Sequence, residues 1–120
     1  MISVIFPCYN EGDSINKIIS SIESALRDSI DTEIILVDNG STDLTQQVLS
    51  QAKKEKRRIR LKSIRIEKNI GYGHGIMEGV RAASGEVIAW THADLQTDPG
   101  DVLEAYETFV NHPKYPNCIL

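Results

Sequence analysis

The sequence is poor in cysteine, which excludes folds that depend on disulfides or structural zinc. Cys8 and Cys118 are its two cysteines. Two thiols so far apart do not make a disulfide framework, and zinc requires three or four ligands at short spacing. We therefore expect both side chains to pack as small apolar groups.

Long hydrophobic runs are also missing, and no stretch approaches the length that spans a bilayer. Met1 is followed at once by an apolar stretch, residues 2–6, without the basic region or cleavage site of a signal peptide. The chain has 120 residues, 41% hydrophobic and 25% charged. These values suit one soluble domain with a single core, and together they predict a cytoplasmic protein.

An overall positive charge is absent too, since the formal net charge is −4. The segment between Lys53 and Lys62 differs, because Glu55 is the one acid among its many lysines and arginines. Such a run is typical of a solvated helix end; the alternative is a peripheral membrane contact, in which each basic residue contributes about 1 kcal/mol on anionic lipid. No aromatic residues interleave with these charges, so nucleic acid is not an expected partner.

The glycine patterns of two large nucleotide-binding classes are missing as well. A dinucleotide-dependent oxidoreductase needs Gly-x-Gly-x-x-Gly after its first strand, whereas residues 7–13 contain only Gly12. The later glycines at 71, 73, 75 and 79 have the wrong spacing. No strand is followed by the glycine–lysine–serine/threonine segment of a P-loop NTPase.

Four short apolar runs are present and predict β-strands at residues 2–6, 33–37, 59–66 and 86–91. The first two are almost continuous β-branched stretches, as expected for strands covered on both faces. The third breaks its alternation once, which predicts an edge strand or a β-bulge.

Helical periodicity fills the intervals between these runs. We expect Asp13 or Ser14 to cap the first helix, and residues 41–43 to open the second. Gly85 is expected to end the third helix in a left-handed conformation, and Asp98 with Pro99 to open the fourth. The apolar positions at helical spacing are Ile15, Ile18, Ile19, Ile22, Ala25 and Leu26, then Leu44, Val48, Leu49 and Ala52, then Ile76, Val80 and Ala83, and finally Val102, Leu103, Tyr106, Phe109 and Val110.

Regular alternation of strand and helix predicts an α/β fold with a mostly parallel sheet and helices on both faces. Ligands of such sheets bind beyond the carboxyl ends of the strands. Four polar segments are expected there, at residues 7–11, 38–43, 68–71 and 92–98. Each one by itself could be only a turn or a helix cap, but four converging segments rich in acids and amides predict a binding site. Such groups can bind a base, ribose hydroxyls and a metal that bridges a diphosphate.

Three segments resemble family 2 inverting glycosyltransferases. They are residues 4–11 (VIFPCYNE), residues 36–43 (LVDNGSTD), and residues 83–86 (ASGE) with residues 93–99 (ADLQTDP). The last pair is similar to the branch that makes polyprenyl-phosphate sugars. The resemblance implies a GT-A fold and inverting transfer of a sugar from a nucleotide-diphosphate sugar to a polyprenyl phosphate or a cell-envelope glycan, at the inner face of the membrane.

The same resemblance implies the residues of the site. It places a divalent cation, Mn²⁺ or Mg²⁺, at the donor diphosphate, with Asp94 as its principal ligand and Gln96 beside it. The family usually has an aspartate where this chain has His92, which leaves two readings open: a third ligand that favours Mn²⁺, or a hydrogen-bonding substitute. The residues implied around the nucleotide are Pro7, Tyr9, Glu11, Asp38, Asn39, Lys68, Asn69, Gly71 and Asp94.

In the family the catalytic base lies further along the chain, and no acid in this sequence matches it by position. None of these 120 residues is therefore expected to be catalytic. Residues 118–120 read as the beginning of a further strand. We therefore expect residues 1–120 to form one donor-binding subdomain, the N-terminal part of a longer enzyme. The alternatives are a sugar nucleotidyltransferase, whose glycine-rich, lysine-containing signature residues 8–11 do not match, and a non-catalytic nucleotide-binding module.

Overall fold

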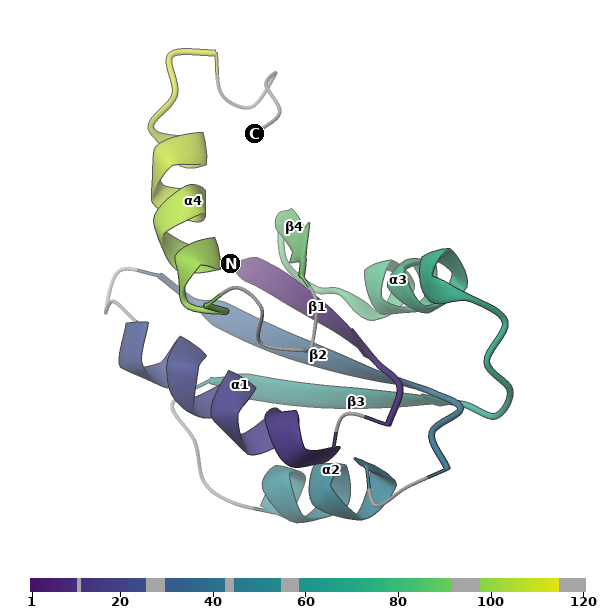
Figure 1. Cartoon of the computed structure of the whole chain (residues 1–120). Coiled ribbons are helices and arrows are strands. Elements are labelled where there is room, and N and C mark those ends of the chain that lie inside the picture. Colours follow the sequence, from purple (N-terminus) through teal and green to yellow (C-terminus); the bar gives the residue numbers. More distant parts are fainter. Residues whose placement is uncertain (11, 26–29, 43–44, 55–58, 92–97, 115–120) are drawn as a thin grey trace.

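The computed structural model describes residues 1–10, 12–25, 30–42, 45–54, 59–91 and 98–114. Strands and helices alternate along the chain, which confirms the predicted order (Figure 1). They are β1 (Ile2–Cys8), α1 (Gly12–Ala25), β2 (Thr32–Asn39), α2 (Thr45–Lys54), β3 (Arg60–Ile66), α3 (Tyr72–Ala82), β4 (Val87–Trp90) and α4 (Asp101–Val110).

The four strands form one parallel sheet in the order β3-β2-β1-β4. Every residue of β1 and β2 is buried, as the continuous apolar runs predict for strands covered on both faces. Both strands are longer than predicted and end at Cys8 and Asn39. Pro7, Asp38 and Asn39, which were expected to follow the strands, are therefore their last residues, where the ladder restrains their backbones.

β3 lies at one edge of the sheet, as predicted, but without a bulge, because its pairing with β2 runs unbroken from Arg60 to Ile66. The break in its pattern has a different cause. Leu61 packs against the core cluster on one face of the sheet, and Ile64 packs against the cluster on the other. The apolar side chains change face within the strand, since helices cover both sides.

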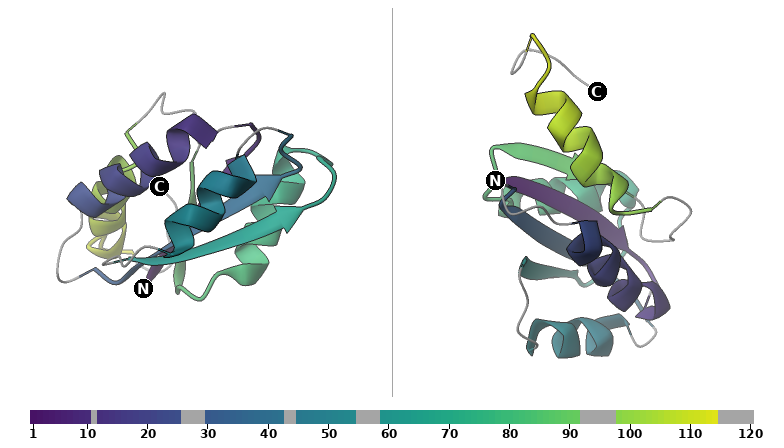
Figure 2. Two further views of the ribbon diagram at one scale, coloured as in Figure 1. Left: turned by 90° about the horizontal axis from the view of Figure 1, so that it is seen from below. Right: turned by 90° about the vertical axis from the view of Figure 1, so that its left-hand side faces the viewer.

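Helices cover the two faces unequally (Figure 2). The larger core joins α1, α2 and α4 to one face of the sheet, with Ile18, Leu49 and Leu103 as buried representatives of the three helices. The smaller core lies under α3 on the opposite face and centres on Ile5 and Val37. The predicted arrangement with helices on both faces is confirmed. No helix in the described part of the chain is long and apolar enough to cross a bilayer.

Three predicted helix ends are wrong. α1 begins at Gly12, so Asp13 and Ser14 lie inside its first turn and do not cap it. α3 ends at Ala82 and the chain is already extended at Ala83, so Gly85 does not terminate the helix. Gly85 is required for a different reason: a Cβ there would lie 2.7 Å from the Met1 carbonyl oxygen and from Ser3 Oγ.

The fourth helix also begins later than predicted, at Asp101. Asp98 and Pro99 form the turn before it, and the Asp98 carboxylate accepts the backbone N–H of Gly100 at 2.9 Å. Leu103 is the buried residue of this helix, and the rest of its apolar face is partly exposed. Cys8 is buried as an apolar group, as expected, and Cys118 lies outside the described residues.

Candidate functional site

The candidate site lies at the carboxyl edge of the sheet, where β1, β2 and β3 end together at the right of Figure 1. Cys8 pairs with Asp38, and Asp38 pairs in turn with Arg65, so the last residues of the three strands are neighbours. The loops that follow therefore begin side by side, although they are far apart in the sequence.

The first two loops are joined through Asn10. Its backbone has a positive φ of 53°, which asparagine tolerates better than most residues. Its N–H donates to Ser41 Oγ at 3.0 Å, and its Oδ1 accepts the N–H of Thr42 at 2.9 Å. These reciprocal bonds hold the segment after Tyr9 against the turn that follows β2.

Asp38 is buried and paired at the centre of the edge. Its Oδ1 accepts the Ser41 N–H at 3.0 Å, and its Oδ2 lies 2.6 Å from Arg65 Nη1. Arg65 Nη1 also donates to the Ser41 carbonyl at 3.2 Å. The carboxylate thus closes the turn and holds the guanidinium. Since the Asp38 side chain is 2% exposed and that of Arg65 is 29% exposed, a ligand would meet the arginine first.

Asn39 joins the second loop to the third. Its Nδ2 donates to the Gly71 carbonyl at 3.1 Å, while its buried Oδ1 has no partner among the described residues. Gly40 has a φ of +75°, and a Cβ there would lie 2.7 Å from the Asn69 N atom. Asn69 Oδ1 in turn accepts the Gly71 N–H at 3.0 Å. Close backbone contact thus brings the Lys68–Gly71 segment to the same edge.

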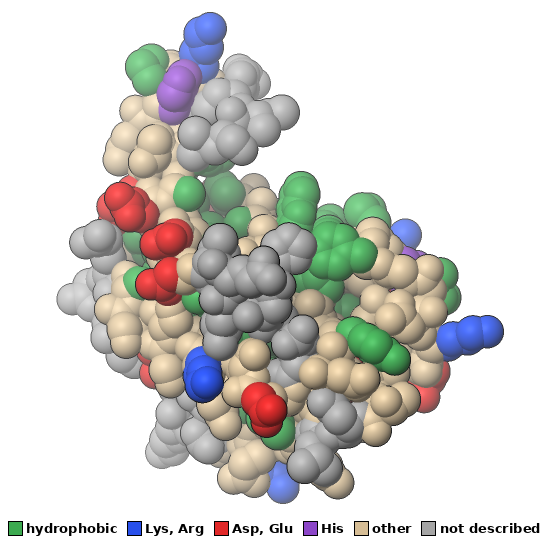
Figure 3. Space-filling view, in the orientation of Figure 1, with side chains coloured by type: hydrophobic (Ala, Val, Ile, Leu, Met, Phe, Trp, Pro, Cys, Tyr) green, Lys and Arg blue, Asp and Glu red, His purple; other side chains and the backbone are tan. Residues whose placement is uncertain are grey.

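Exposed side chains surround this framework. Tyr9 is 48% exposed and Tyr72 is 45% exposed, so neither ring is core packing. Lys68 and Asn69 are also exposed, whereas Pro7 is buried beside Gly75 of α3. Figure 3 shows further hydrophobic side chains gathered over β4 and beside α3. The exposed rings supply flat apolar surface directly after β1 and at the start of α3.

The predicted metal ligands His92, Asp94 and Gln96, and the predicted nucleotide residue Glu11, lie outside the described residues. Within the described part of the chain, no group of three or more His, Cys, Asp or Glu side chains could hold a metal. The Thr91 N–H donates to the Ile5 carbonyl at 3.1 Å, so Thr91, the last described residue before the predicted ligands, lies beside β1. Carboxylate, amide and imidazole ligands suit a divalent cation such as Mn²⁺.

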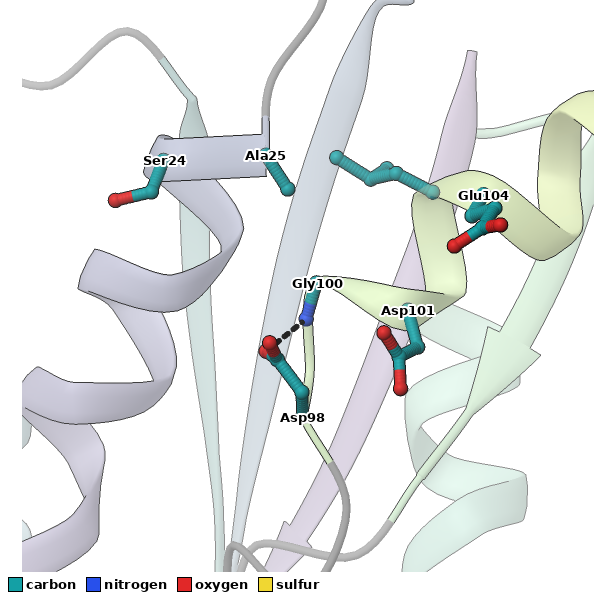
Figure 4. A pocket seen from close by; sticks show the side chains of 7 residues that line it. Ser24, Ala25, Asp98, Gly100, Asp101 and Glu104 are labelled. Atoms are coloured by element: carbon teal, nitrogen blue, oxygen red, sulfur yellow. Dashed lines mark hydrogen bonds between the residues drawn. The ribbon is translucent and has the colours of Figure 1, made fainter.

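A separate hollow of about 290 Å³ lies between α1 and α4 (Figure 4). Hydrogen bonds from the Ser21 hydroxyl and the Gly100 N–H lower the pKa of Asp98 at its rim. Asp101 and Glu104 add two more acids to its lining. Such a hollow repels a diphosphate, so it does not belong to the candidate site.

Comparison with known proteins identifies the family. The model of Glycosyl transferase family 2 matches residues 3–118. The chain belongs to this family. This membership confirms the resemblance and removes the sugar nucleotidyltransferase alternative.

Relatives of this family member include two lipid-phosphate transferases. The chain is 33% identical over 102 residues to the undecaprenyl-phosphate 4-deoxy-4-formamido-L-arabinose transferase of Pectobacterium carotovorum, covering 84% of this chain and 31% of the relative. It is 33% identical over 110 residues to the dolichol-phosphate mannosyltransferase of Pyrococcus furiosus, covering 92% of this chain and 30% of the relative. The chain thus spans less than a third of either protein's length.

A solved structure confirms the expected GT-A fold. The mannosyltransferase from Pyrobaculum calidifontis in complex with GDP-Man and Mn²⁺ superposes with a TM-score of 0.78 at 25% identity. The alignment covers 93% of this chain and 32% of the mannosyltransferase.

Sequence reasoning missed Arg65 as a part of this edge. A weak signal existed for Arg65, because it is the last charged residue of the predicted strand at residues 59–66. Its partner Asp38 is 27 positions away, and only the register of β2 and β3 brings the two together.

Proposed function

We propose that this family 2 chain binds the nucleoside diphosphate of a sugar donor at the carboxyl edge of its sheet, and that the protein transfers the sugar, with inversion, to a polyprenyl phosphate. The observation that supports this most directly is the arrangement of Tyr9, Arg65 and Asp38. An exposed ring lies on the same sheet edge as a half-exposed guanidinium held by a buried carboxylate. The lipid-phosphate acceptor is carried over from the two relatives.

Different described residues would contact different parts of the nucleotide. The Tyr9 ring offers a face on which a base can stack. Arg65, held in place by the buried Asp38 carboxylate, presents donors to the base edge. The Oδ1 of Asn39, which has no partner among the described residues, can accept from a ribose hydroxyl or bound water. Lys68 and the backbone of the Asn69–Gly71 segment border the same space.

A divalent cation completes the proposed site. Asp94 would hold it with Gln96, and His92 would tilt the preference towards Mn²⁺. The cation would neutralise the charge that develops on the leaving nucleoside diphosphate. Glu11, two positions after Tyr9, would lie on the nucleotide side.

Calorimetric titration with UDP-, GDP-, dTDP- and CMP-sugars, each with and without Mn²⁺, tests this function. We expect one base to be preferred, and Mn²⁺ to tighten its binding in the native chain but much less in Asp94→Asn. Equal enhancement in both proteins would remove Asp94 from the site. Failure of all four donors to bind would refute the proposed function.

We further propose that residues 1–120 act as one donor-binding unit and that the catalytic base belongs to a later segment of the protein. The donor would then bind without transfer in the 120-residue chain. Sugar transfer by this chain alone would contradict the proposal, and donor binding by a complete protein that never yields product would favour a non-catalytic module.

We also propose that the protein works at the inner face of the membrane, in synthesis of a cell-envelope glycan. Lys53 and Lys54 are exposed at the end of α2, and Arg60 is exposed at the start of β3. Lys62 does not join this basic surface, because its ammonium pairs with buried Glu33. The surface lies at the amino ends of the strands, opposite the nucleotide edge.

A further inference from the structure

A buried polar network lies at the amino end of the sheet, under the turn from α3 into β4. We define the Glu33 network as the side chains of Ser3, Glu33 and Lys62 together with Ser84. Glu33 is 1% exposed and lies opposite buried Ser3 of β1. A buried carboxylate is costly unless it is paired and hydrogen-bonded, so its partners reveal what the charge stabilises.

The partners of Glu33 come from each neighbouring strand and from the turn. Ser3 Oγ donates to Glu33 Oε2 at 2.6 Å, and Lys62 Nζ lies 2.5 Å from Oε1. The backbone N–H of Ser84 donates to Oε2 at 3.0 Å. Lys62 Nζ also donates to the Ala82 carbonyl at 3.1 Å and to Ser84 Oγ at 2.8 Å.

The network therefore binds the end of α3 and the start of β4, in addition to the local bond from the Ala83 N–H to the Val80 carbonyl. The Gly85 N–H donates to Ser3 Oγ at 2.8 Å, and the Glu86 N–H donates to the Met1 carbonyl at 3.0 Å. A side chain at Gly85 would collide with Met1 and Ser3, so the turn fits in one position only. Together these contacts hold the beginning of β4 against β1.

β4 needs such a restraint because its own sequence specifies its register weakly. It has four residues, and among the described strands it pairs only with β1. Val87 and Ala89 face one core and Ile88 the other. A slip by two residues would leave every side chain on its present face, yet would move the end of the strand by about 6.6 Å.

We propose that the Glu33 network positions the proposed cation site, because it fixes the register of β4 and so the position of Thr91, the last described residue before the predicted cation ligands. This inference rests on the proposed function, in which those ligands hold the cation. Tyr9, Asp38 and Arg65 lie on β1, β2 and β3 or directly after them and do not depend on β4. Damage to the network should thus lower the metal-dependent part of binding and spare the rest.

The test measures the factor by which Mn²⁺ tightens binding of GDP and of UDP, together with the metal-free affinity. In Glu33→Gln the amide would face the Lys62 ammonium or the Ser84 N–H with a donor. We expect the Mn²⁺ factor to fall roughly tenfold, the lower end for residues that support metal ligands, while the metal-free affinity stays unchanged. Lys62→Arg should keep most of the tightening by Mn²⁺, since the arginine keeps a positive charge beside Glu33.

Arg60→Met is the matched control, because Arg60 lies on the same strand in an exposed pair with Asp31 at 3.8 Å. It should leave both quantities unchanged. If Glu33→Gln does not fold, Ser3→Ala replaces it: this milder change removes the acceptor of the Gly85 N–H and keeps the ion pair. An intact variant with an unchanged Mn²⁺ factor, or with equal loss of both affinities, would overturn the inference.

Hydrogen exchange separates this inference from the proposed function. The Thr91 N–H, which bonds to Ile5, should exchange faster in Glu33→Gln, whereas amides between β1 and β2 should not change. If Mn²⁺ does not tighten nucleotide binding by the native chain, the proposed metal site has failed. In that case the exchange rate of the Thr91 N–H alone tests whether the Glu33 network fixes the register of β4. Unchanged protection of this amide in Glu33→Gln would overturn the inference.

Discussion

Asp38 and Arg65 show how one residue pair can serve both the fold and the site. The carboxylate closes the turn after β2 and holds a half-exposed guanidinium at the nucleotide edge. Removing the acid frees the arginine and leaves the Ser41 N–H without its acceptor. The two functions should therefore be lost together.

We expect Asp38→Ala to weaken binding of the preferred nucleoside diphosphate by roughly 1.5–3 kcal/mol, the range for a hydrogen bond to a charged group. Calorimetry measures this, with circular dichroism as the test of folding. Asp31→Ala is the matched control, because Asp31 is an exposed acid whose arginine partner lies 3.8 Å away. Unchanged affinity in a folded Asp38→Ala would place the nucleotide elsewhere.

Glu33 predicts a pH dependence of stability. Burial raises the pKa of Glu33, but the hydrogen bonds from Lys62, Ser3 and the Ser84 N–H, with the charge of Lys62, outweigh burial and hold the pKa below its ordinary value. The folded state therefore binds this proton more weakly than the unfolded chain does. The stabilisation is present above the ordinary glutamate pKa of about 4.3 and is lost as pH falls through the lower, folded value.

Urea unfolding between pH 7 and pH 3 measures this dependence. The native chain should lose stability at the acid end, and Glu33→Gln should lose less over the same interval because it has no proton to take up. Parallel curves for the two proteins would show that other carboxylates cause the acid loss.

At the scale of elements, α3 packs closely on β1 through a glycine. A Cβ at Gly79 would lie 2.5 Å from Ile5 Cγ2, whereas one at Gly73 in the same helix would have nothing within 4 Å. The two glycines therefore differ in what they do: one permits close approach, and the other only costs helix stability.

Gly79→Ala should lower the free energy of unfolding by about 1–3 kcal/mol through overpacking. Gly73→Ala should raise it by up to about 1 kcal/mol, since alanine is the better helix former. Urea denaturation of both variants checks the contrast. Two variants with the same stability change would mean that α3 does not press on Ile5.

At the scale of the whole molecule, basic side chains lie at the two opposite ends of the sheet. The nucleotide edge holds Arg65 and Lys68, and the opposite end carries Lys53 and Lys54 on α2. Membrane attachment and donor binding should therefore be separable.

Lys54→Glu should reduce sedimentation of the chain with phosphatidylserine-rich vesicles, because each basic residue near such a surface contributes about 1 kcal/mol. Affinity for the nucleoside diphosphate should not change. Lys17→Glu makes the same charge change on the exposed side of α1 and serves as the control. Equal loss in both variants would indicate a net-charge effect without a binding surface.

The sequence by itself determined the order of strands and helices along the chain, the parallel sheet and both covered faces, and it indicated the sheet edge at which we propose the site. These follow from local pattern: β-branched runs, apolar spacing of three and four, and polar residues directly after each run. The family motifs of residues 4–11 and 36–43 could be read in the same way, since each is contiguous in the chain.

Only the tertiary structure decided which polar groups pair. Arg65 meets Asp38, and Lys62 meets Glu33, because β3 lies next to β2 in one particular register. The end of α3 is capped from two other strands, so its true boundary and the reason for Gly85 were invisible in the local sequence. Periodicity encodes the face on which a side chain lies, but partners across strands depend on strand order and register, which no single segment contains.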